Sequence, residues 1–291
     1  MESLPLVVIV GPTASGKTGL SIKIAKAFNG EIISADSRAI YKGMDIGAAK
    51  PTEAEREGVS HWGFDLVEPG ERFTVADFQK YTNQKIAEIR ARGHVPIIAG
   101  GTGLYIDSVV FDYEFPAEPA GDGRATWEAQ SLQELHEYCV RNNVALPENR
   151  LNKRYVVNAI LRNGHALKRR NTPIENSIIV GITTDKMTLR DRIATRTEQL
   201  FNDGVVGESK VLGKKYGWGS QAMTGNIYPL IRRYIMGELT LHEIKQLFIV
   251  KDWHLAKRQL TWFKRNEYIA WLPLDQAYTY VAQTLDNLNK L

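Results

Sequence analysis

The amino-acid sequence predicts an α/β protein with a parallel sheet flanked by helices, an inserted small helical domain and a helical C-terminal region. In residues 6–110, apolar runs of strand length alternate with segments of helical periodicity, which is the pattern of strand–helix–strand units. Helical patterns alone occupy residues 124–162, and an apolar strand pattern returns at residues 177–182. The sheet is therefore expected to be interrupted by the insertion.

Prolines and glycines mark the start of the insertion. Pro116 and Gly121 lie in a stretch without periodicity that separates the last helix of the first part from the helical segment. We expect the core to comprise residues 1–112 and 176–291, and the inserted domain to comprise residues 113–175.

Composition limits the class of protein. The chain has 291 residues, of which 43% are hydrophobic and 24% charged, so it can bury a sizeable core. The net charge of +4 is compatible with a polyanionic partner without requiring one. The single cysteine, Cys139, excludes an internal disulfide, and its apolar neighbours favour a buried structural thiol over a nucleophile. Without a signal-peptide pattern or a transmembrane apolar run, we expect a cytoplasmic protein with no membrane partner, and a monomer.

A glycine-bounded loop follows the first apolar run and opens a helix. It matches the pattern G-x-x-x-x-G-K-[ST] at Gly11, Pro12, Thr13, Ala14, Ser15, Gly16, Lys17 and Thr18. Backbone N–H groups of such a loop converge on anionic oxygens, Lys17 adds a positive charge, and the Thr18 hydroxyl can ligate Mg²⁺. The sequence therefore predicts a P-loop NTPase-like core that holds a diphosphate or triphosphate, and an ordinary turn is the weaker interpretation.

Polar residues end the next two predicted strands. Asp36 follows the apolar run at residues 31–35, and Thr102 lies in a glycine turn after residues 94–99. Because ligands gather outside the carboxyl ends of parallel strands, we expect Asp36 to face the same crevice as the phosphate loop. Its carboxylate can act as a general base or an indirect magnesium ligand, and an N-cap is the alternative. The Thr102 hydroxyl can meet a phosphate or a base edge.

The segments between these strands are of two kinds. Residues 37–67 are punctuated by glycine and are interpreted as loops around the site, where His61 is a candidate ligand contact with packing as the commoner alternative. Thr74 and Asp77 have the spacing of a capping box, which predicts a helix ending near Gly93.

Basic residues are concentrated in the insertion. Helical patterns run over residues 124–141 and 151–162, and no acidic residue occurs between Asn149 and Ile174. The basic residues of that run are Arg150, Lys153, Arg154, Arg162, Lys168, Arg169 and Arg170. The run suits a phosphate backbone, and a solvated helix face is an equal alternative.

The last part of the chain has two further groups of cations. Thr188 and Asp191 have capping-box spacing, and Arg192 and Arg196 lie one helical turn apart, where they can clamp a diphosphate or form a solvated face. Residues 253–265 mix cations with aromatic rings on one helix. This mixture can pair phosphates while stacking bases, although a core helix with extended lysines has the same pattern.

Five sequence blocks together resemble the tRNA dimethylallyltransferases and occur in that family's order. They are residues 11–18, 31–37, 40–47, 100–105 and 256–263. The resemblance implies transfer of a dimethylallyl group from dimethylallyl diphosphate to the exocyclic amine of the adenine directly 3′ of the anticodon in tRNA, with Mg²⁺ required.

The resemblance also implies residue roles. Residues 11–18 would bind the diphosphate, with Thr13 near the reacting centre and Lys17 and Thr18 at the leaving group. Asp36 would be the general base, and Arg192 or Arg196 would bind the diphosphate. The residues expected to contact the tRNA anticodon stem-loop are Asp36, Ser37, Arg38, Ala39, Thr102, Arg124, Lys153, Arg154, Tyr155, Lys257 and Arg258.

The chain departs from the family pattern at five places. The family's usual Gly-Thr-Ala-Lys-Pro, His-His-Leu, Arg-Ala-Leu-Glu, Gly-Tyr and Thr-Arg are replaced at Ala48, Trp62, Asn158, Asn226 and Asp252-Trp253, respectively. We expect most of these on the tRNA side, affecting RNA affinity more than chemistry. Three alternatives remain: a P-loop small-molecule or nucleotide kinase with an arginine lid, a prenyltransferase of free adenylate, and a non-catalytic RNA-binding protein.

Overall fold

The computed structural model describes residues 4–115, 123–164 and 168–288. The chain divides into two compact units, Met1–Val110 with Thr172–Leu291 and Phe111–Asn171. Pro116 and Gly121, which predict the start of the insertion, lie outside the described residues. Among the helices within those three ranges, none is long and apolar enough to cross a membrane.

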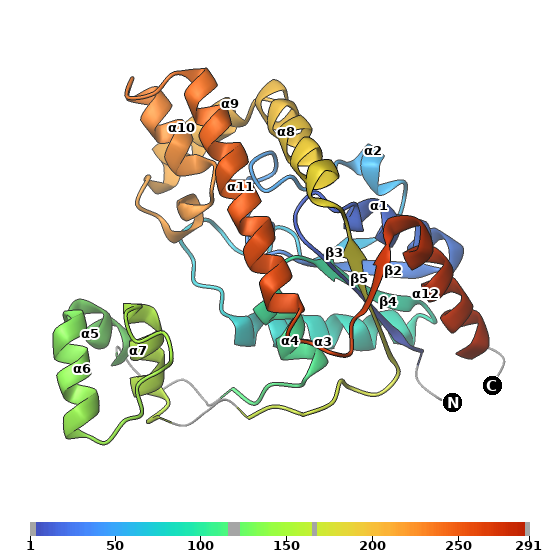
Figure 1. Cartoon of the computed structure of the whole chain (residues 1–291), viewed down its shortest axis with the longest axis horizontal. Helices are drawn as coiled ribbons and strands as arrows, with labels where there is room; N and C mark the ends of the chain where they lie inside the picture. The colour runs from blue at the N-terminus through green and yellow to red at the C-terminus, as the bar shows by residue number, and fades with distance from the viewer. Residues whose placement is uncertain (1–3, 116–122, 165–167, 289–291) are drawn as a thin grey trace. The chain divides into compact units, whose positions relative to one another are not determined.

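The larger unit is built on a parallel sheet (Figure 1). Its six strands in the described part of the chain have the order β3-β2-β4-β1-β5-β6. The strands are β1 Leu6–Val10, β2 Gly30–Ala35, β3 His61–Trp62, β4 Val95–Gly100, β5 Ser177–Thr183 and β6 Ala270–Pro273. Each pair of neighbours is parallel. Strand β1 lies between β4 and β5, and all its residues are buried, as its unbroken apolar run predicts. The predicted α/β class is confirmed.

Helices cover this sheet and extend beyond it (Figure 1). They are α1 Lys17–Ala27, α2 Glu53–Arg56, α3 Val75–Ala91, α4 Gly103–Val110, α8 Lys186–Asn202, α9 Val205–Tyr216, α10 Tyr228–Ile235, α11 Leu241–Phe263 and α12 Leu274–Leu288, with a 3-10 turn η1 Gln221–Thr224. Helices α1 and α12 share an apolar core with the inner residues of β1, β2, β4 and β5. A second core joins the loop after β2 to α9, α10 and α11.

The local signals for helix α3 are confirmed. The Thr74 hydroxyl accepts from the Asp77 N–H at 3.2 Å, and the Asp77 carboxylate accepts from the Thr74 N–H at 2.8 Å. Phe78, Ile86 and Ile89 are buried. Periodicity and a capping box together fix where this helix begins and which face it buries.

Two expectations about local structure are wrong. Thr188 does not cap helix α8: the N-cap is Asp185, whose carboxylate accepts from the N–H groups of Met187 and Thr188. The helix therefore begins three residues earlier than a Thr188 cap predicts, and the Asp185 carboxylate satisfies its first free amides. The loop segment 37–67 also contains helix α2 and strand β3, and β3 pairs with β2 over only two residues.

The smaller unit is helical, with α5 Gly123–Ala129, α6 Leu132–Arg141 and α7 Lys153–Leu161 in its described part. The helical pattern over residues 124–141 is two helices, because Ser131 caps the second with a capping box. Cys139 is buried beside Leu135 and Val156, and burial raises the pKa of its thiol. The structural interpretation of this cysteine is confirmed.

Candidate active site

Three neighbouring strands of the sheet end at the same level. Ala35 of β2 pairs with Gly100 of β4, and Gly100 pairs with Val10 of β1. The chain continues from these ends into Asp36, the glycine turn and the phosphate loop. Gly100 permits this close spacing, since a Cβ there would lie 2.3 Å from the Ala35 carbonyl oxygen. The three segments therefore start from one edge of the sheet.

The phosphate loop has the backbone that an anion site needs. Gly16 is the N-cap of α1 with φ 93°, a left-handed conformation that favours glycine, and it brings no capping side chain to the first amides of the helix. The Lys17 ammonium folds back and donates to the Pro12 carbonyl oxygen at 2.5 Å. Burial, followed by the Arg196 charge, lowers the pKa of Lys17 to about 7, while Asp36 opposes that shift.

Two arginines from one face of α8 reach this loop. Arg196 donates through Nη1 to the Thr13 hydroxyl, and Arg192 Nη1 lies 3.4 Å from the Ser15 carbonyl oxygen to which it donates. Their i, i+4 spacing places both guanidinium groups on the loop from the same side. The structure therefore brings together the loop and both predicted arginines.

Helix α11 also contributes contacts at the loop. Gln259 Oε1 accepts from the Thr13 N–H at 2.8 Å, and Asp252 Oδ2 lies 3.6 Å from Arg196 Nη1. Ala256 lies between them on the same helix face and is fully buried in an apolar cluster that also contains Ile193 of α8. No function was assigned to Asp252 or Gln259 from the sequence. The available signal was their spacing of seven residues, which places both side chains on the same face of a helix.

The sequence of residues 253–265 allowed two interpretations, a surface that binds phosphates and bases or a helix packed in the core, and the structure shows features of each on different faces of α11. One face, at Asp252, Ala256 and Gln259, lies against the phosphate loop and α8. Lys257 and Arg258 are exposed and line a shallow groove together with Trp262. These cations are placed where an anionic partner has access to them.

Asp36 is held in a turn after β2. Its Oδ1 accepts from the Arg38 N–H at 2.7 Å, so the capping alternative is present and uses one of the two carboxylate oxygens. The Ser37 N–H donates to the Thr102 hydroxyl at 3.1 Å, which ties the ends of β2 and β4 together. The Arg38 guanidinium donates to the Ala222 carbonyl oxygen of η1, and Ala39 is buried.

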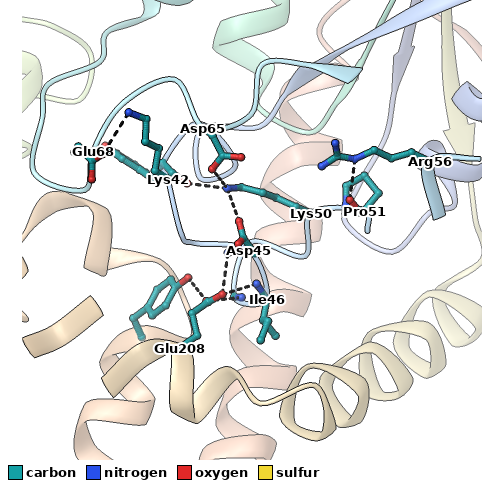
Figure 2. Close-up of polar contacts among 12 residues, drawn as sticks. Lys42, Asp45, Ile46, Lys50, Pro51, Arg56, Asp65, Glu68 and Glu208 are labelled. Carbon is teal, nitrogen blue, oxygen red and sulfur yellow. Dashed lines mark hydrogen bonds and ion pairs between the residues drawn. The ribbon is translucent and has the colours of Figure 1, made fainter. Parts of the chain in front are cut away.

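The loop after this turn is fixed by one carboxylate, as Figure 2 shows. Glu208 of α9 accepts from the N–H groups of Asp45, Ile46 and Gly47 at 2.8, 2.6 and 2.9 Å. Lys50 crosses the same loop and donates to the Asp45 and Asp65 carboxylates at 2.8 and 2.7 Å (Figure 2). These contacts give residues 41–51 a defined shape without regular secondary structure.

His61 has the surroundings of a packing residue. Its Nδ1 lies 2.9 Å from the Val59 carbonyl oxygen, and its ring stacks on Phe64. Burial lowers the pKa of this histidine. The structure favours the packing alternative over a ligand contact.

The predicted tRNA-contacting residues of the smaller unit fall into two groups. The Arg124 guanidinium donates to Oδ1 of the Asn158 side chain at 2.6 Å, and Lys153 donates to the Glu128 backbone carbonyl oxygen at 2.6 Å. Arg154 and Tyr155 are exposed. The first two cations have intramolecular partners, and the second pair is exposed to solvent.

The donor set for magnesium is incomplete without phosphates. Among the described residues, no group of three or more His, Cys, Asp and Glu side chains is arranged to hold a metal ion. Thr18 is exposed at the start of α1, and its hydroxyl is a suitable hard ligand. Such a site fits an ion that is held mainly by substrate phosphates and water.

Similarity to known proteins covers nearly the whole chain. A family model described as IPP transferase matches residues 39–266, and one described as Isopentenyl transferase matches residues 4–65. The tRNA dimethylallyltransferase of Acetivibrio thermocellus is 38% identical over 93% of this chain and 92% of its own length. The tRNA dimethylallyltransferase of Bacillus subtilis is 36% identical over 97% and 98%, respectively.

Solved structures with similar folds also belong to transferases named for tRNA. The tRNA isopentenylpyrophosphate transferase of Bacillus halodurans has a TM-score of 0.75 and 32% identity, covering 98% of both chains. The Staphylococcus epidermidis transferase has a TM-score of 0.74 and 34% identity, covering 97% of this chain and 98% of its own. A eukaryotic dimethylallyltransferase has a TM-score of 0.81 at 20% identity and 74% coverage of its chain, which supports the fold alone.

Proposed function

The chain belongs to the tRNA dimethylallyltransferase family, and we propose that it transfers a dimethylallyl group from dimethylallyl diphosphate to the exocyclic amine of the adenine 3′ of the anticodon in tRNA. The observation that carries the proposal is the meeting of the phosphate loop, two arginines and Asp36 at one edge of the sheet. The named relatives are dimethylallyl or isopentenyl transferases, so we set the kinase and non-catalytic alternatives aside.

In this proposal the phosphate loop holds the leaving group. When the bond between the allylic carbon and the diphosphate oxygen breaks, negative charge develops on that oxygen and positive charge on the prenyl group. The amides that follow Gly16, the Lys17 ammonium and the Arg196 guanidinium would stabilise that negative charge, and their common position at the loop supports this role. Thr13 links that arginine to the loop.

Magnesium fits the same region. Thr18 would hold the ion together with diphosphate oxygens, and the bound ion would neutralise developing charge on the leaving group. The need for Mg²⁺ stays a prediction.

Asp36 is the proposed general base. The adenine amine forms a bond to the allylic carbon, the diphosphate departs with its electron pair, and one amine proton moves to the Asp36 carboxylate. The Arg38 N–H fixes the orientation of that carboxylate through one oxygen. Holding the amine and the carbon in line supplies much of the rate acceleration.

The adenine must leave the anticodon-loop stack before it reacts. Unstacking costs a few kcal/mol, which contacts to the flipped base and to the RNA backbone must offset. Thr102 and Arg38 flank the Asp36 turn, and Lys257 and Arg154 are exposed cations for the backbone. We propose these as RNA contacts, with the anticodon stem-loop as the partner and a cytoplasmic monomer as the working form.

Product analysis tests the proposal directly. The protein is incubated with dimethylallyl diphosphate, Mg²⁺ and unmodified tRNA, and the nucleosides are analysed by mass spectrometry; prenylated adenosine is expected. Transfer to free adenylate in preference to an anticodon stem-loop would instead identify an adenylate prenyltransferase. Phosphate transfer from labelled ATP without prenyl transfer would support the kinase alternative.

A matched pair of variants tests the assignment of Asp36 as the general base. Asp36→Ala is expected to retain tRNA binding and to lose most single-turnover activity, by about 10²- to 10⁴-fold for a general base. Asp191→Ala removes an exposed carboxylate from α8 and serves as the control. Near-wild-type single-turnover rates for Asp36→Ala would reject the assignment.

A further inference from the structure

We propose that Asp252 is a positioning residue that sets the orientation of Arg196 over the phosphate loop. The inference rests on the proposed function, in which Arg196 binds the diphosphate. Asp252 lies in the middle of α11, and Arg196 lies on α8. The carboxylate is a partner of the arginine rather than of the substrate.

A continuous row of polar contacts leads from a half-buried amide to the loop. The Asn226 Nδ2 group donates to Asp252 Oδ1 at 2.9 Å, and Asp252 Oδ2 lies 3.6 Å from Arg196 Nη1. The same Nη1 donates to the Thr13 hydroxyl. Asn226 thereby fixes one carboxylate oxygen and leaves the other directed at the guanidinium group. The remaining nitrogens of Arg196 can still approach a diphosphate.

Burial makes this arrangement costly unless the carboxylate is paired. The Asp252 side chain is 6% exposed, whereas that of Arg196 is 29% exposed. A buried carboxylate loses its hydration, and only a cation and hydrogen bonds recover that free energy. Arg196 is therefore drawn to a fixed place before the diphosphate binds, which lowers the conformational entropy lost on binding.

The pair also explains one departure from the family pattern. The family resemblance predicts Thr-Arg where this chain has Asp252-Trp253. Both residues contact arginines of α8: Asp252 pairs with Arg196, and the Arg190 guanidinium lies 4.6 Å from the centre of the Trp253 ring. These two positions therefore contact α8, and Asp252 lies beside an arginine that reaches the phosphate loop.

Loss of the Asp252 charge has two opposing effects on diphosphate binding. It frees Arg196 to adopt other orientations, which weakens binding, and it removes a negative charge near an anionic ligand, which strengthens binding. A single variant cannot separate them. The orientation effect requires Arg196, whereas the charge effect acts through space and persists without it. A double-mutant cycle therefore distinguishes the two.

The experiment compares Asp252→Asn, Arg196→Met and the double variant. Single-turnover prenyl transfer gives kcat/KM for the donor, and calorimetry with magnesium pyrophosphate gives a binding constant that does not depend on transfer activity. We expect Asp252→Asn to lower kcat/KM about tenfold, through loss of the ion pair that orients Arg196. In the Arg196→Met background the same change should have less than about a twofold effect on both measurements.

Glu198→Gln provides the matched control. Glu198 of α8 pairs with Lys245 of α11 at 2.5 Å, so this variant breaks another ion pair between the same two helices. It should leave pyrophosphate binding and kcat/KM unchanged. An equal loss in this control, or an equal effect of Asp252→Asn with and without Arg196, would overturn the inference. If the cycle behaves as expected for pyrophosphate while tRNA is not prenylated, the proposed function fails and the inference about Asp252 stands.

Discussion

Gln259 accepts a hydrogen bond from the backbone N–H of Thr13 at 2.8 Å, so a residue near the end of the chain holds the loop near its beginning. The same side chain lies against the glycine turn after β4, since a Cβ on Gly101 would be 2.3 Å from Gln259 Nε2. One amide group therefore contacts both the phosphate loop and the turn that carries Thr102. Helix α11 thus completes the site as well as packing on it.

Gln259→Ala should weaken the use of the prenyl donor. The Thr13 N–H would lose its acceptor and the loop would lose a fixed position, so we expect kcat/KM for dimethylallyl diphosphate to fall about tenfold. Steady-state kinetics at saturating tRNA measure this change. Gln246→Ala, an exposed glutamine on the same helix, is the control and should behave as wild type. A similar loss in both variants would contradict the assigned function of the Gln259 side chain.

Gly103→Ala should destabilise the junction between α4 and α11. A Cβ there would lie 2.1 Å from Cδ1 of Trp262, whose Nε1 donates to the Asp107 carboxylate at 2.8 Å. Displacing a packed indole should lower the free energy of unfolding by about 1–3 kcal/mol. Urea unfolding measures the loss.

A second glycine provides the control for that experiment. Gly207 lies inside α9, and a Cβ there would meet no heavy atom within 4 Å. Gly207→Ala should therefore raise the free energy of unfolding by up to about 1 kcal/mol through helix propensity. Equal destabilisation by both substitutions would show that steric contact with Trp262 is not the cause.

Glu31 should make stability depend on pH. Burial acts to raise the pKa of this carboxyl group, but hydrogen bonds from Arg92, Trp62 and His94 outweigh it and lower the pKa to about 2. Because the folded-state pKa is lowered, the stabilisation is present above the ordinary value of 4.5 and is lost as the pH falls towards 2.

Glu31→Gln tests that linkage. The variant should lower the free energy of unfolding by about 2 kcal/mol at pH 7, because it leaves a partly exposed Arg92 without its carboxylate. The difference from wild type should shrink at pH 3. Urea unfolding at both pH values measures it, and a difference independent of pH would mean that the Glu31 charge contributes no stability.

Much of the fold could be predicted from the sequence because its signals are local. The unbroken apolar run of β1, the capping box at Thr74 and the loop pattern ending in Lys17 each depend on neighbouring residues. The N-cap of α8 could not be assigned from spacing alone. Both Asp185 and Thr188 precede the apolar stripe, and only the hydrogen bonds of the folded backbone identify Asp185.

The candidate site was predictable only in part. Each strand end could be located from the sequence, but the contacts that join Thr13 to Gln259 and Arg196 to Asp252 cross long stretches of chain. Nothing local marks Gln259 as a partner of Thr13. Such contacts arise from the packing of α8 on α11, which the separate periodicities of two helices do not specify.

Lys17 should make diphosphate binding depend on pH. Burial, followed by the Arg196 charge, lowers its pKa to about 7, so at pH 8 the free protein holds mainly the neutral amine. A bound diphosphate favours the charged form and raises that pKa again. Binding at pH 8 should therefore take up as much as about one proton, and affinity should fall as the pH rises above 7.

Calorimetry with magnesium pyrophosphate in Tris and in HEPES at pH 8 measures the proton uptake, because the two buffers differ in ionisation enthalpy. Lys17→Arg is the informative control, since a guanidinium group stays charged at this pH and has no proton to gain. Protonation of the pyrophosphate itself contributes equally to both proteins and cancels in the comparison. Wild type should therefore exceed Lys17→Arg in uptake, and equal uptake by the two proteins would show that Lys17 is already charged before the diphosphate arrives.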